Sequence, residues 1–455
     1  MKSSVLDSDL LRGIFVSEEM REVFSDDSLL QKWLDTWIAL AKAEADVGVI
    51  PKFAAEEIEK KADINDFDRE IIRKGIVDTT HPLIVQIREF TKSVGGKAGG
   101  YIHWGATTQD IMDTAVVLQI KQAQEVLVKQ LKQFLKKLLQ LAEEHAETVM
   151  PGRTHGQHAL PITLGYKIAI WADEIGKHIE RLEAGKERYL LGSFGGAAGT
   201  LASIHNDGLA VQKRFCEYLG LVQPTITWHV QRDGFAEFAS IIAMISGTIG
   251  KIANEIINLQ KSEIGEMEEG FKMGQVGSST MPHKRNPMIC EYVVGLTRVV
   301  QRNASLSFDA MIQEHERDMT FWTTEWSYLP QICMLTSGGL EQIQGVLERF
   351  IVYPDNMERN LNLLQGLIVS ENLMLSLGEF VGRGEAHDIV YEVSMKAFEE
   401  KKSLIDVVLT DERITNHISE EEAKKLLEPK NYIGLCKTFI SRVEEKWGNQ
   451  DTSIN

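Results

Sequence analysis

Cysteine is scarce in this chain of 455 residues, and the few that occur are scattered. Cys216, Cys290, Cys333 and Cys436 form no Cys-x-x-Cys pair. This spacing excludes a disulfide framework and a zinc site built from cysteine pairs, and it predicts buried thiols in a reducing compartment. We therefore expect a cytoplasmic protein.

Positive charge and long apolar runs are also lacking. Lysine and arginine total 49 against 66 acidic residues, so the formal net charge is −17. Such a balance argues against nucleic acid or an anionic membrane as a partner, and any anion-binding site must be locally basic. No uninterrupted run of about eighteen apolar residues and no N-terminal apolar stretch after positive charge occurs, so neither a transmembrane helix nor a signal peptide is expected.

Helical periodicity is what the sequence has in abundance. Residues 115–148 contain no proline or glycine, and their apolar residues recur at three- and four-residue steps. Similar stretches cover 161–191, 233–262, 288–315 and 325–352. Helices of about thirty residues span roughly 45 Å and can bury their apolar stripes only against one another. The stretch at 233–262 is apolar on more than one face, which predicts packing between bundles of different subunits.

A chain of this length exceeds one compact core. We expect an all-α fold in three helical domains. Residues 1–113 would form the N-terminal domain, 114–360 a central bundle of long helices, and 361–455 a small C-terminal domain.

One segment, 277–287, interrupts the helical pattern with an unusual set of functional groups. It reads Gly-Ser-Ser-Thr-Met-Pro-His-Lys-Arg-Asn-Pro, and its prolines at 282 and 287 exclude an ordinary helix. Lys284 and Asn286 can bind a carboxylate, and a glycine-rich loop that closes can exclude water around a serine. A solvated loop with a basic tip is the alternative, but the concentration of different groups favours a functional site.

A second candidate site lies just before the long helical stretch, at residues 102–110. Thr107 and Thr108 precede a helix N-terminus, whose free N–H groups and positive dipole attract anions. The same residues are also good helix caps, so the sequence leaves anion binding and capping equally open.

Histidines mark two further interruptions. His155 and His158 lie between Gly152 and Pro161, where one of them could move protons near neutral pH. Metal binding is the alternative, but no Cys, Asp or Glu accompanies them at ligand spacing, so we expect no metal. His81, before a proline, is a weaker candidate with a structural role as its simplest explanation.

The chain resembles the fumarase/aspartase superfamily. Its signature Gly-Ser-Ser-x-x-Pro-x-Lys-x-Asn is met by Gly277, Ser278, Ser279, Pro282, Lys284 and Asn286, and its Gly-x-Thr-His-x-Gln by Gly152, Thr154, His155 and Gln157. The motifs occur in the expected order over nearly the whole chain. They resemble most the branch that holds adenylosuccinate lyase and 3-carboxy-cis,cis-muconate cycloisomerase.

That resemblance implies an anti β-elimination next to a substrate carboxylate. A loop serine, Ser278 in preference to Ser279, would remove the proton, and His155 would protonate the leaving group. Substrate would be bound by His81, His103, Thr107, Thr108, Thr154, Gln157, Lys284, Asn286 and Arg317. The resemblance further implies a small carboxylated substrate, no cofactor, and a homotetramer with shared active sites.

One residue that differs from the adenylosuccinate lyase pattern narrows the range of expected substrates. Where adenylosuccinate lyases carry an arginine that holds the nucleotide phosphate, this chain has Trp326, and an indole cannot bind phosphate bidentately. The sequence therefore favours a 3-carboxy-cis,cis-muconate cycloisomerase, with adenylosuccinate lyase or another C–N lyase that releases fumarate from an N-succinyl substrate as the alternative. A helical scaffold without activity would be expected to have lost the polar motifs, and all are present.

Overall fold

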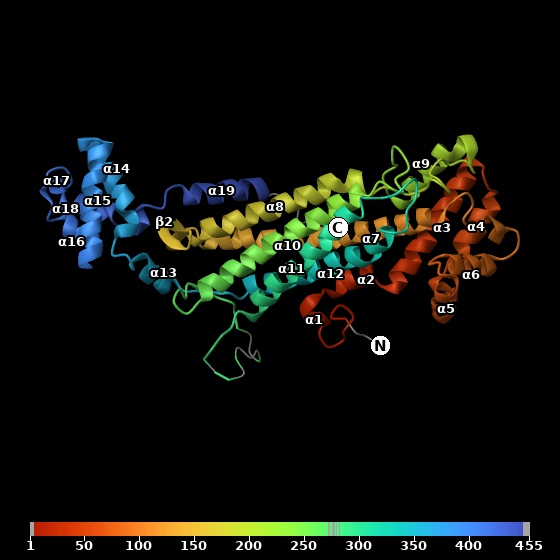
Figure 1. Cartoon of the computed structure of the whole chain (residues 1–455), viewed down its shortest axis with the longest axis horizontal. Helices are drawn as coiled ribbons and strands as arrows, with labels where there is room; N and C mark the ends of the chain where they lie inside the picture. The colour runs from red at the N-terminus through yellow and green to blue at the C-terminus, as the bar shows by residue number, and fades with distance from the viewer. Residues whose placement is uncertain (1–3, 272–273, 275–277, 279, 282, 449–455) are drawn as a thin grey trace. The chain divides into compact units, whose positions relative to one another are not determined.

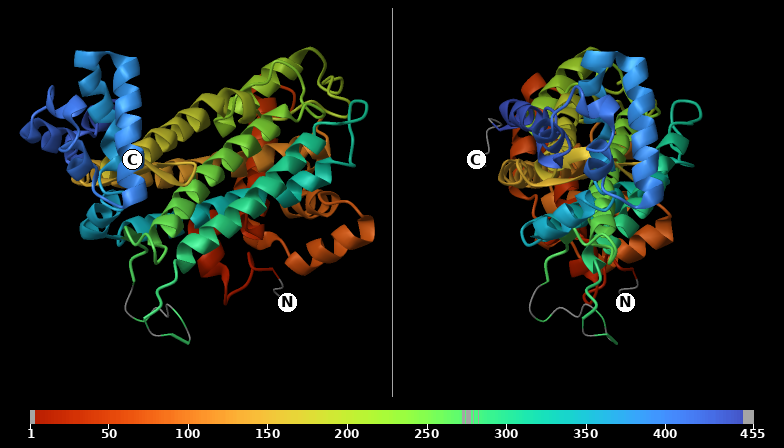
Figure 2. Two further views of the ribbon diagram at one scale, coloured as in Figure 1. Left: turned by 60° about the vertical axis from the view of Figure 1, so that its left-hand side comes forward. Right: turned by 90° about the vertical axis from the view of Figure 1, so that its left-hand side faces the viewer.

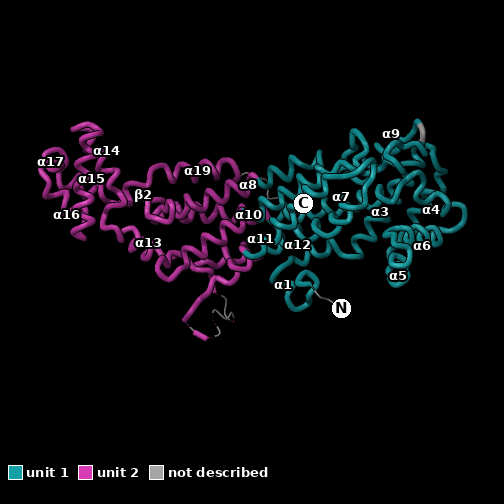
Figure 3. The backbone as a smooth tube through the Cα atoms, viewed as in Figure 1, with its two compact units in different colours: residues 1–130, 178–247, 295–341 teal, residues 131–177, 248–294, 342–455 magenta. Residues whose placement is uncertain are grey.

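The computed structural model describes residues 4–271, 274, 278, 280–281 and 283–448, and it is mostly helical (Figure 1; Figure 2). The chain forms two compact units, shown in Figure 3. Unit 1 consists of residues 1–130, 178–247 and 295–341, and unit 2 of residues 131–177, 248–294 and 342–455. The three-domain division expected from the sequence stays a prediction.

Five long helices contribute residues to both units. They are α7 (Thr108–Glu144), α8 (Leu164–Tyr189), α10 (Asp233–Gln260), α11 (Met288–Asp309) and α12 (Trp322–Leu347). Each overlaps most of one of the five predicted periodic stretches, so the five long helices are confirmed. Their ends differ from the prediction, since residues 161–163 belong to β2 and residues 351–352 to β4. α7 begins earlier than the predicted start, because the residues from Thr108 to Asp110 form its first turn.

The remaining elements each belong to a single unit, and most of them are short. Unit 1 also holds α1 (Arg12–Phe15), α2 (Glu18–Val23), α3 (Asp26–Val47), α4 (Lys52–Lys60), η1 (Ile64–Asp66), α5 (Arg69–Thr79), α6 (Ile84–Val94), η2 (Ala98–Tyr101), η3 (His205–Asp207) and α9 (Gly208–Leu219). Unit 2 holds β1 (Val149–Thr154), β2 (Gln157–Thr163), β3 (Met267–Glu268), β4 (Ile351–Val352), α13 (Pro354–Leu361), η4 (Leu367–Val369), α14 (Ser370–Val381), α15 (Arg383–Glu400), α16 (Leu404–Val408), α17 (Glu412–Thr415), α18 (Glu420–Leu426), η5 (Pro429–Asn431) and α19 (Cys436–Trp447).

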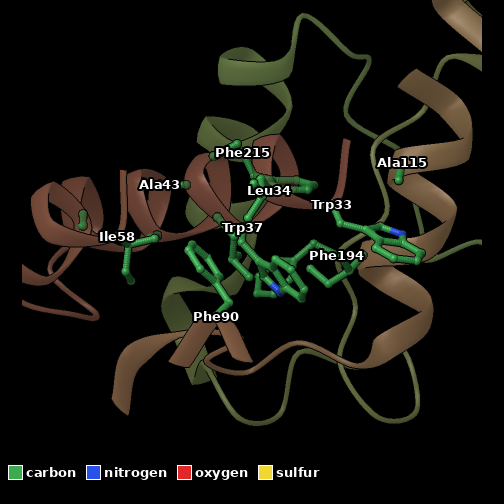
Figure 4. Close-up of a cluster of buried hydrophobic side chains, with 14 of the residues drawn as sticks. Trp33, Leu34, Trp37, Ala43, Ile58, Phe90, Ala115, Phe194 and Phe215 are labelled. Carbon is green, nitrogen blue, oxygen red and sulfur yellow. The ribbon is translucent and has the colours of Figure 1, made fainter. Parts of the chain in front are cut away.

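The core of unit 1 is organised around α3. Ser25 caps the helix by accepting a hydrogen bond from the N–H of Ser28, and Gly48 ends it in the left-handed conformation. Between these caps, Trp37 packs against Phe90 with ring centroids 5.5 Å apart. Figure 4 shows Trp37 pointing toward Phe90 and Phe194, while Trp33 lies toward Ala115 of α7.

A carboxyl group is buried in the same helix. The side chain of Glu44 has no exposed surface, and neither of its carboxyl oxygens has a hydrogen-bond partner in the described part of the chain. Burial raises the pKa of Glu44 to about 9. A carboxyl whose pKa is raised by folding contributes stability below its unfolded pKa, and this stability is lost as the pH rises to the folded pKa.

We therefore expect Glu44→Gln to flatten the pH dependence of stability. Between pH 4.5, the ordinary pKa of a glutamate, and pH 7, the wild-type chain should lose roughly 3 kcal/mol relative to the variant, and the difference should keep growing until pH 9. Urea unfolding of both proteins at pH 5, 7 and 9 measures this. The exposed Glu56→Gln on α4 is the control, and identical slopes for wild type and Glu44→Gln would contradict the expectation.

One helix of the described chain, α10, is long and apolar enough to cross a membrane by composition alone. In the structure, 67% of its most apolar window is buried inside the protein. A core helix of a globular protein passes the same test, so α10 is a buried core helix. Met244 on this helix is 42% exposed, so α10 is not covered on every side within one chain.

Four short strands in the described part of the chain correct the all-α expectation in two places. β3 and β4 pair antiparallel over two residues each, Met267 with Val352 and Glu268 with Ile351. β1 and β2 form an antiparallel hairpin, paired from Val149 with Thr163 to Thr154 with Gln157. The sequence around them is too rich in proline and glycine for a helix, and the register shifts between Pro151 and Arg153. A side chain at the intervening Gly152 would lie 2.6 Å from the carbonyl oxygen of Leu160, so the hairpin requires glycine there.

Candidate active site

The candidate residues fall into two groups, one in each unit. The group in unit 1 begins at the N-terminus of α7. The Arg317 guanidinium donates to the hydroxyls of both Thr107 and Thr108, at 3.1 Å in the case of Thr108. The structure therefore brings three predicted substrate-binding residues together, at a helix end whose free N–H groups and dipole also favour an anion. Arg317 is exposed, so its charge is accessible.

Asp110, buried in the first turn of α7, fixes the backbone around this cluster. Its carboxylate accepts hydrogen bonds from the backbone N–H groups of Thr107, Gly195 and Gly196, each at 2.9 Å. It also pairs with His229 Nε2 at 2.7 Å. Asp110 thus caps α7 and holds the glycine-containing segment at 194–199 against it. The two threonine hydroxyls accept hydrogen bonds from Arg317, and anion binding at this helix end stays a prediction.

A buried ion cluster supports the next turn of α7. Arg232 donates to Asp113 at 2.7 and 3.2 Å and to Glu325 at 2.8 Å, and all three side chains are about 1% exposed. Trp322 Nε1 also donates to Asp113, at 2.8 Å. Burial alone would lower the pKa of Arg232, but Asp113 and Glu325 outweigh it and raise that pKa. The arginine therefore stays charged and ties α7 to α12 within unit 1.

His103 lies on the segment that leads into α7. Its Nδ1 accepts a hydrogen bond from Trp37 Nε1 at 3.3 Å, and the two rings are in edge contact at 6.5 Å. Burial lowers the pKa of His103 to about 4, and Asp110 offsets this only in part. The imidazole is therefore neutral near pH 7.

His81 lies at the N-terminus of α6. Its Nδ1 accepts hydrogen bonds from the N–H groups of Leu83 and Ile84, at 3.3 and 3.2 Å, and so caps the helix. The structural role that the sequence suggested for His81 is thus present. It leaves Nε2 available for a second role.

The group in unit 2 includes His155, at the tip of the β1–β2 hairpin. His155 and Gly156 form a two-residue turn with φ values of 53° and 77°, as a type I′ turn requires. Thr154 and Gln157 flank the turn as a pair, and all four residues are exposed. The tip therefore presents three predicted residues together.

A buried ion pair holds the base of this hairpin. Arg153 donates to both oxygens of Glu266, at 2.9 and 2.6 Å, and Asn360 Nδ2 donates to the same carboxylate at 2.7 Å. Glu266 has no exposed surface. The pKa of the neighbouring His158 is lowered by burial and by Arg153. The protonated form of His158 is thereby disfavoured.

The signature loop is anchored at both ends. Before it, the Glu269 carboxylate accepts from the N–H groups of Ile289 and Cys290, at 3.1 and 2.9 Å, and so caps α11. Gln260 bridges the two ends, since its amide accepts from Glu269 N–H at 2.8 Å and donates to the Arg285 carbonyl at 2.9 Å. These contacts fix the residues that lead into and out of the loop.

Within the loop, the Ser278 hydroxyl oxygen accepts hydrogen bonds from the N–H groups of Thr280 and Met281, at 3.3 and 3.1 Å. Lys284 and Asn286 lie close to the anchored end of the loop, before α11. Ser279, together with Gly277 and Pro282 of the signature, lies outside the described residues.

Backbone strain concentrates at the candidate residues. Seven non-glycine residues of the described chain have positive φ. Four of them are Thr80, His103, His155 and His315, with φ between 52° and 62°. Each is a candidate residue or lies within two positions of one. Thr80 ends α5 as its left-handed C-cap and His155 is in the hairpin turn, so the local fold explains these two. His103 and His315 are in neither kind of position, and a non-glycine residue in this region costs about 1–3 kcal/mol.

Several supporting residues were not identified as such from the sequence. These residues, which were not selected as candidates, are Trp37, Asp110, Arg232, Glu266 and Glu325. Their partners lie far away in the chain, so spacing carries no signal for them. No group of three or more His, Cys, Asp or Glu with metal-binding geometry occurs among the described residues.

Comparison with known proteins extends these observations. A protein family described as "Lyase" matches residues 15–301, and "Adenylosuccinate lyase C-terminus" matches residues 366–443. An N-acetyl-S-(2-succino)cysteine lyase from Enterococcus italicus is 41% identical over 98% of each chain. An adenylosuccinate lyase from Methanocaldococcus jannaschii is 43% identical over 93% of each chain. The crystal structure of 3-carboxy-cis,cis-muconate lactonizing enzyme from Pseudomonas putida matches with a TM-score of 0.91 and 36% identity, over 97% of this chain and 99% of that one. This chain is a member of the fumarase/aspartase superfamily of lyases.

Proposed function

We propose that this lyase releases fumarate from a small succinylated thiol or amine that carries no phosphate. The observation that carries the proposal is the cluster of Arg317 with the Thr107 and Thr108 hydroxyls at the N-terminus of α7. A succinyl group has two carboxylates, and this cluster provides a charged donor, hydroxyls and a helix dipole for one of them. Lys284 and Asn286 would bind the other.

The reaction balances without a co-reactant. Ser278 removes a proton from C3 of the succinyl group, and the electron pair first occupies the adjacent carboxylate as an aci-carboxylate. The bond from C2 to sulfur or nitrogen then breaks as His155 protonates the leaving atom, which gives fumarate and a free thiol or amine. Two N–H groups that already donate to the Ser278 hydroxyl oxygen would stabilise its alkoxide.

The absence of phosphate from the proposed substrate rests on Trp326. This side chain packs against the core cluster of unit 1, with its ring centroid 5.1 Å from that of Trp322. An indole in this position offers no bidentate donor to a phosphate. The proposal therefore follows the Enterococcus italicus relative, whose name specifies N-acetyl-S-(2-succino)cysteine, in preference to adenylosuccinate.

The sequence had favoured a muconate cycloisomerase. The full-length relatives quoted above support the alternative better, because both are named for succinyl substrates and both exceed 40% identity. The similarity to the lactonizing enzyme supports the fold and the shared carboxylate chemistry. We further propose a cytoplasmic homotetramer in which copies of the chain share their active sites.

The proposal is tested by incubating the purified chain with N-acetyl-S-(2-succino)cysteine and following fumarate by its ultraviolet absorbance and free thiol by a thiol reagent. We expect both products in equal amounts. Adenylosuccinate and 3-carboxymuconate, assayed alongside, should turn over at least about 10³-fold more slowly in kcat/KM, because a site lacking the required polar partners rejects a substrate strongly. Efficient adenylosuccinate cleavage would show that Trp326 does not exclude a substrate with a phosphate. Turnover of 3-carboxymuconate alone would instead support the cycloisomerase function.

A further inference from the structure

Two histidines of unit 1 share a hydrogen-bonding arrangement that fixes their tautomers. An indole N–H can only donate, so the bond from Trp37 Nε1 requires an unprotonated Nδ1 on His103. The backbone N–H groups of Leu83 and Ile84 place the same requirement on Nδ1 of His81. In both rings the proton must therefore be on Nε2.

The surroundings of His103 keep the ring neutral. Burial is the main cause, and the nearby His81 acts in the same direction. Asp110 is the charged group that opposes them, but its carboxylate is already occupied by three backbone N–H groups and His229. Protonation of His103 would also have to break the bond from Trp37, since a protonated Nδ1 cannot accept it.

We infer that Trp37 is a positioning residue, which holds His103 as a neutral Nε2–H donor that binds an acceptor oxygen of the substrate and transfers no proton. The inference depends on the proposed function only for the identity of that substrate. His103 lies four residues before Thr107, on the segment that leads into α7. The substrate oxygen that we assign to it is therefore one near the carboxylate proposed to bind at Thr107 and Arg317. The backbone of His103 has a φ of 62°, a strained conformation of the kind found where a side chain has to keep a fixed orientation.

The first test replaces Trp37 by phenylalanine, which keeps an aromatic ring in the core but removes the indole N–H together with part of the ring system. We expect KM for N-acetyl-S-(2-succino)cysteine to rise between about three-fold and ten-fold with kcat changed less than two-fold, as for one lost hydrogen bond in binding. Trp33→Phe is the matched control. Trp33 is buried in the same helix, and its Nε1 has no hydrogen-bond partner in the described chain, so this change should leave KM unaltered. Equal effects of the two changes would reduce Trp37 to a packing role and overturn the inference.

A second test asks which ring nitrogen matters. The amide N–H of glutamine can replace an Nε2–H donor, whereas that of asparagine lies closer to the position of Nδ1. We expect His103→Gln to keep most of the binding and His103→Asn to lose it. Asparagine tolerates positive φ better than glutamine, so a purely structural role for His103 predicts the opposite order. That opposite order would overturn the inference.

A third measurement separates this inference from the proposed function. The full-length chain is labelled with ¹⁵N-histidine, and the His103 resonances are assigned by their loss in His103→Gln. From pH 8 down to pH 5 they should show an unprotonated Nδ1 and a protonated Nε2. In Trp37→Phe the two tautomers should exchange. A persistent Nε2–H tautomer without turnover of any succinylated substrate would end the proposed function alone, whereas a protonated Nδ1 on the wild-type ring would end the inference whatever the substrate.

Discussion

Replacing Arg232 by methionine is expected to lower the free energy of unfolding by about 3–5 kcal/mol, because it leaves two buried carboxylates without their counter-charge. Asp113 and Glu325 are both about 1% exposed, and Arg232 supplies donors to each of them. Methionine has a similar length and keeps contact with the rings of Trp228 and Phe235, which lie 5.0 and 4.7 Å from the guanidinium. The loss of unfolding free energy should therefore come mainly from the missing charge and only to a small extent from altered packing. Urea unfolding at one fixed protein concentration measures it.

The chain contains a matched control for this change. Arg214 also pairs with two carboxylates, those of Asp46 and Glu217, and also lies 5.0 Å from an aromatic ring, that of Tyr218. Its side chain is 44% exposed, so water screens the pairs, and Arg214→Met should leave the unfolding midpoint unchanged. A comparable loss in both variants would show that burial is not what makes Arg232 important.

A third variant, Glu325→Gln, tests the two carboxylates that pair with Arg232 separately. Burial raises the pKa of Glu325, and Arg232 offsets this rise only in part. Glu325→Gln leaves a neutral pair of Arg232 with Asp113 and keeps an oxygen that can accept from the guanidinium. We expect it to cost much less than Arg232→Met, and a larger cost would show that the two carboxylates are needed together.

The long helices were predictable because each carries its own signal. Apolar residues such as Leu127, Leu131 and Leu138 recur along one face of α7, and all three are fully buried. The lack of helix in the described residues of 277–287 was predictable for a similar reason, since the prolines at 282 and 287 exclude a helix locally. Such signals need no knowledge of the rest of the chain.

The supports of the site could not be predicted in this way. Asp113, Arg232 and Glu325 come from three separate parts of the sequence, and nothing in their spacing shows that they share one buried cluster. The hairpin at 149–163 was missed because its strands are short and contain prolines, which usually argue against a strand. The His155–Gly156 turn was the available signal, since a polar residue followed by glycine favours a hairpin turn.

Replacing Ser278 by alanine is expected to lower kcat by about 10²- to 10⁴-fold with little change in KM, as for loss of a general base. The structure supports this serine because its hydroxyl oxygen already accepts two backbone N–H groups, which would stabilise the alkoxide formed in the reaction. Alanine removes the base and leaves Lys284 and Asn286 in place to bind the carboxylate. Ser279→Ala is the matched control, and we expect it to keep at least a tenth of the wild-type kcat.

Proton exchange separates the base from the acid in the same reaction. In deuterated water the wild-type enzyme should exchange the C3 proton of the succinyl group, which proton NMR detects as loss of that signal from remaining substrate. Ser278→Ala should abolish this exchange. His155→Asn should retain the exchange but release no fumarate, because the aci-carboxylate still forms while its leaving group goes unprotonated. Asparagine accepts the φ of 53° at this position, so the turn is preserved and the loss reports the imidazole alone. Exchange that survives in Ser278→Ala and disappears in Ser279→Ala would move the base to the second serine, and exchange lost in His155→Asn would assign proton removal to the histidine.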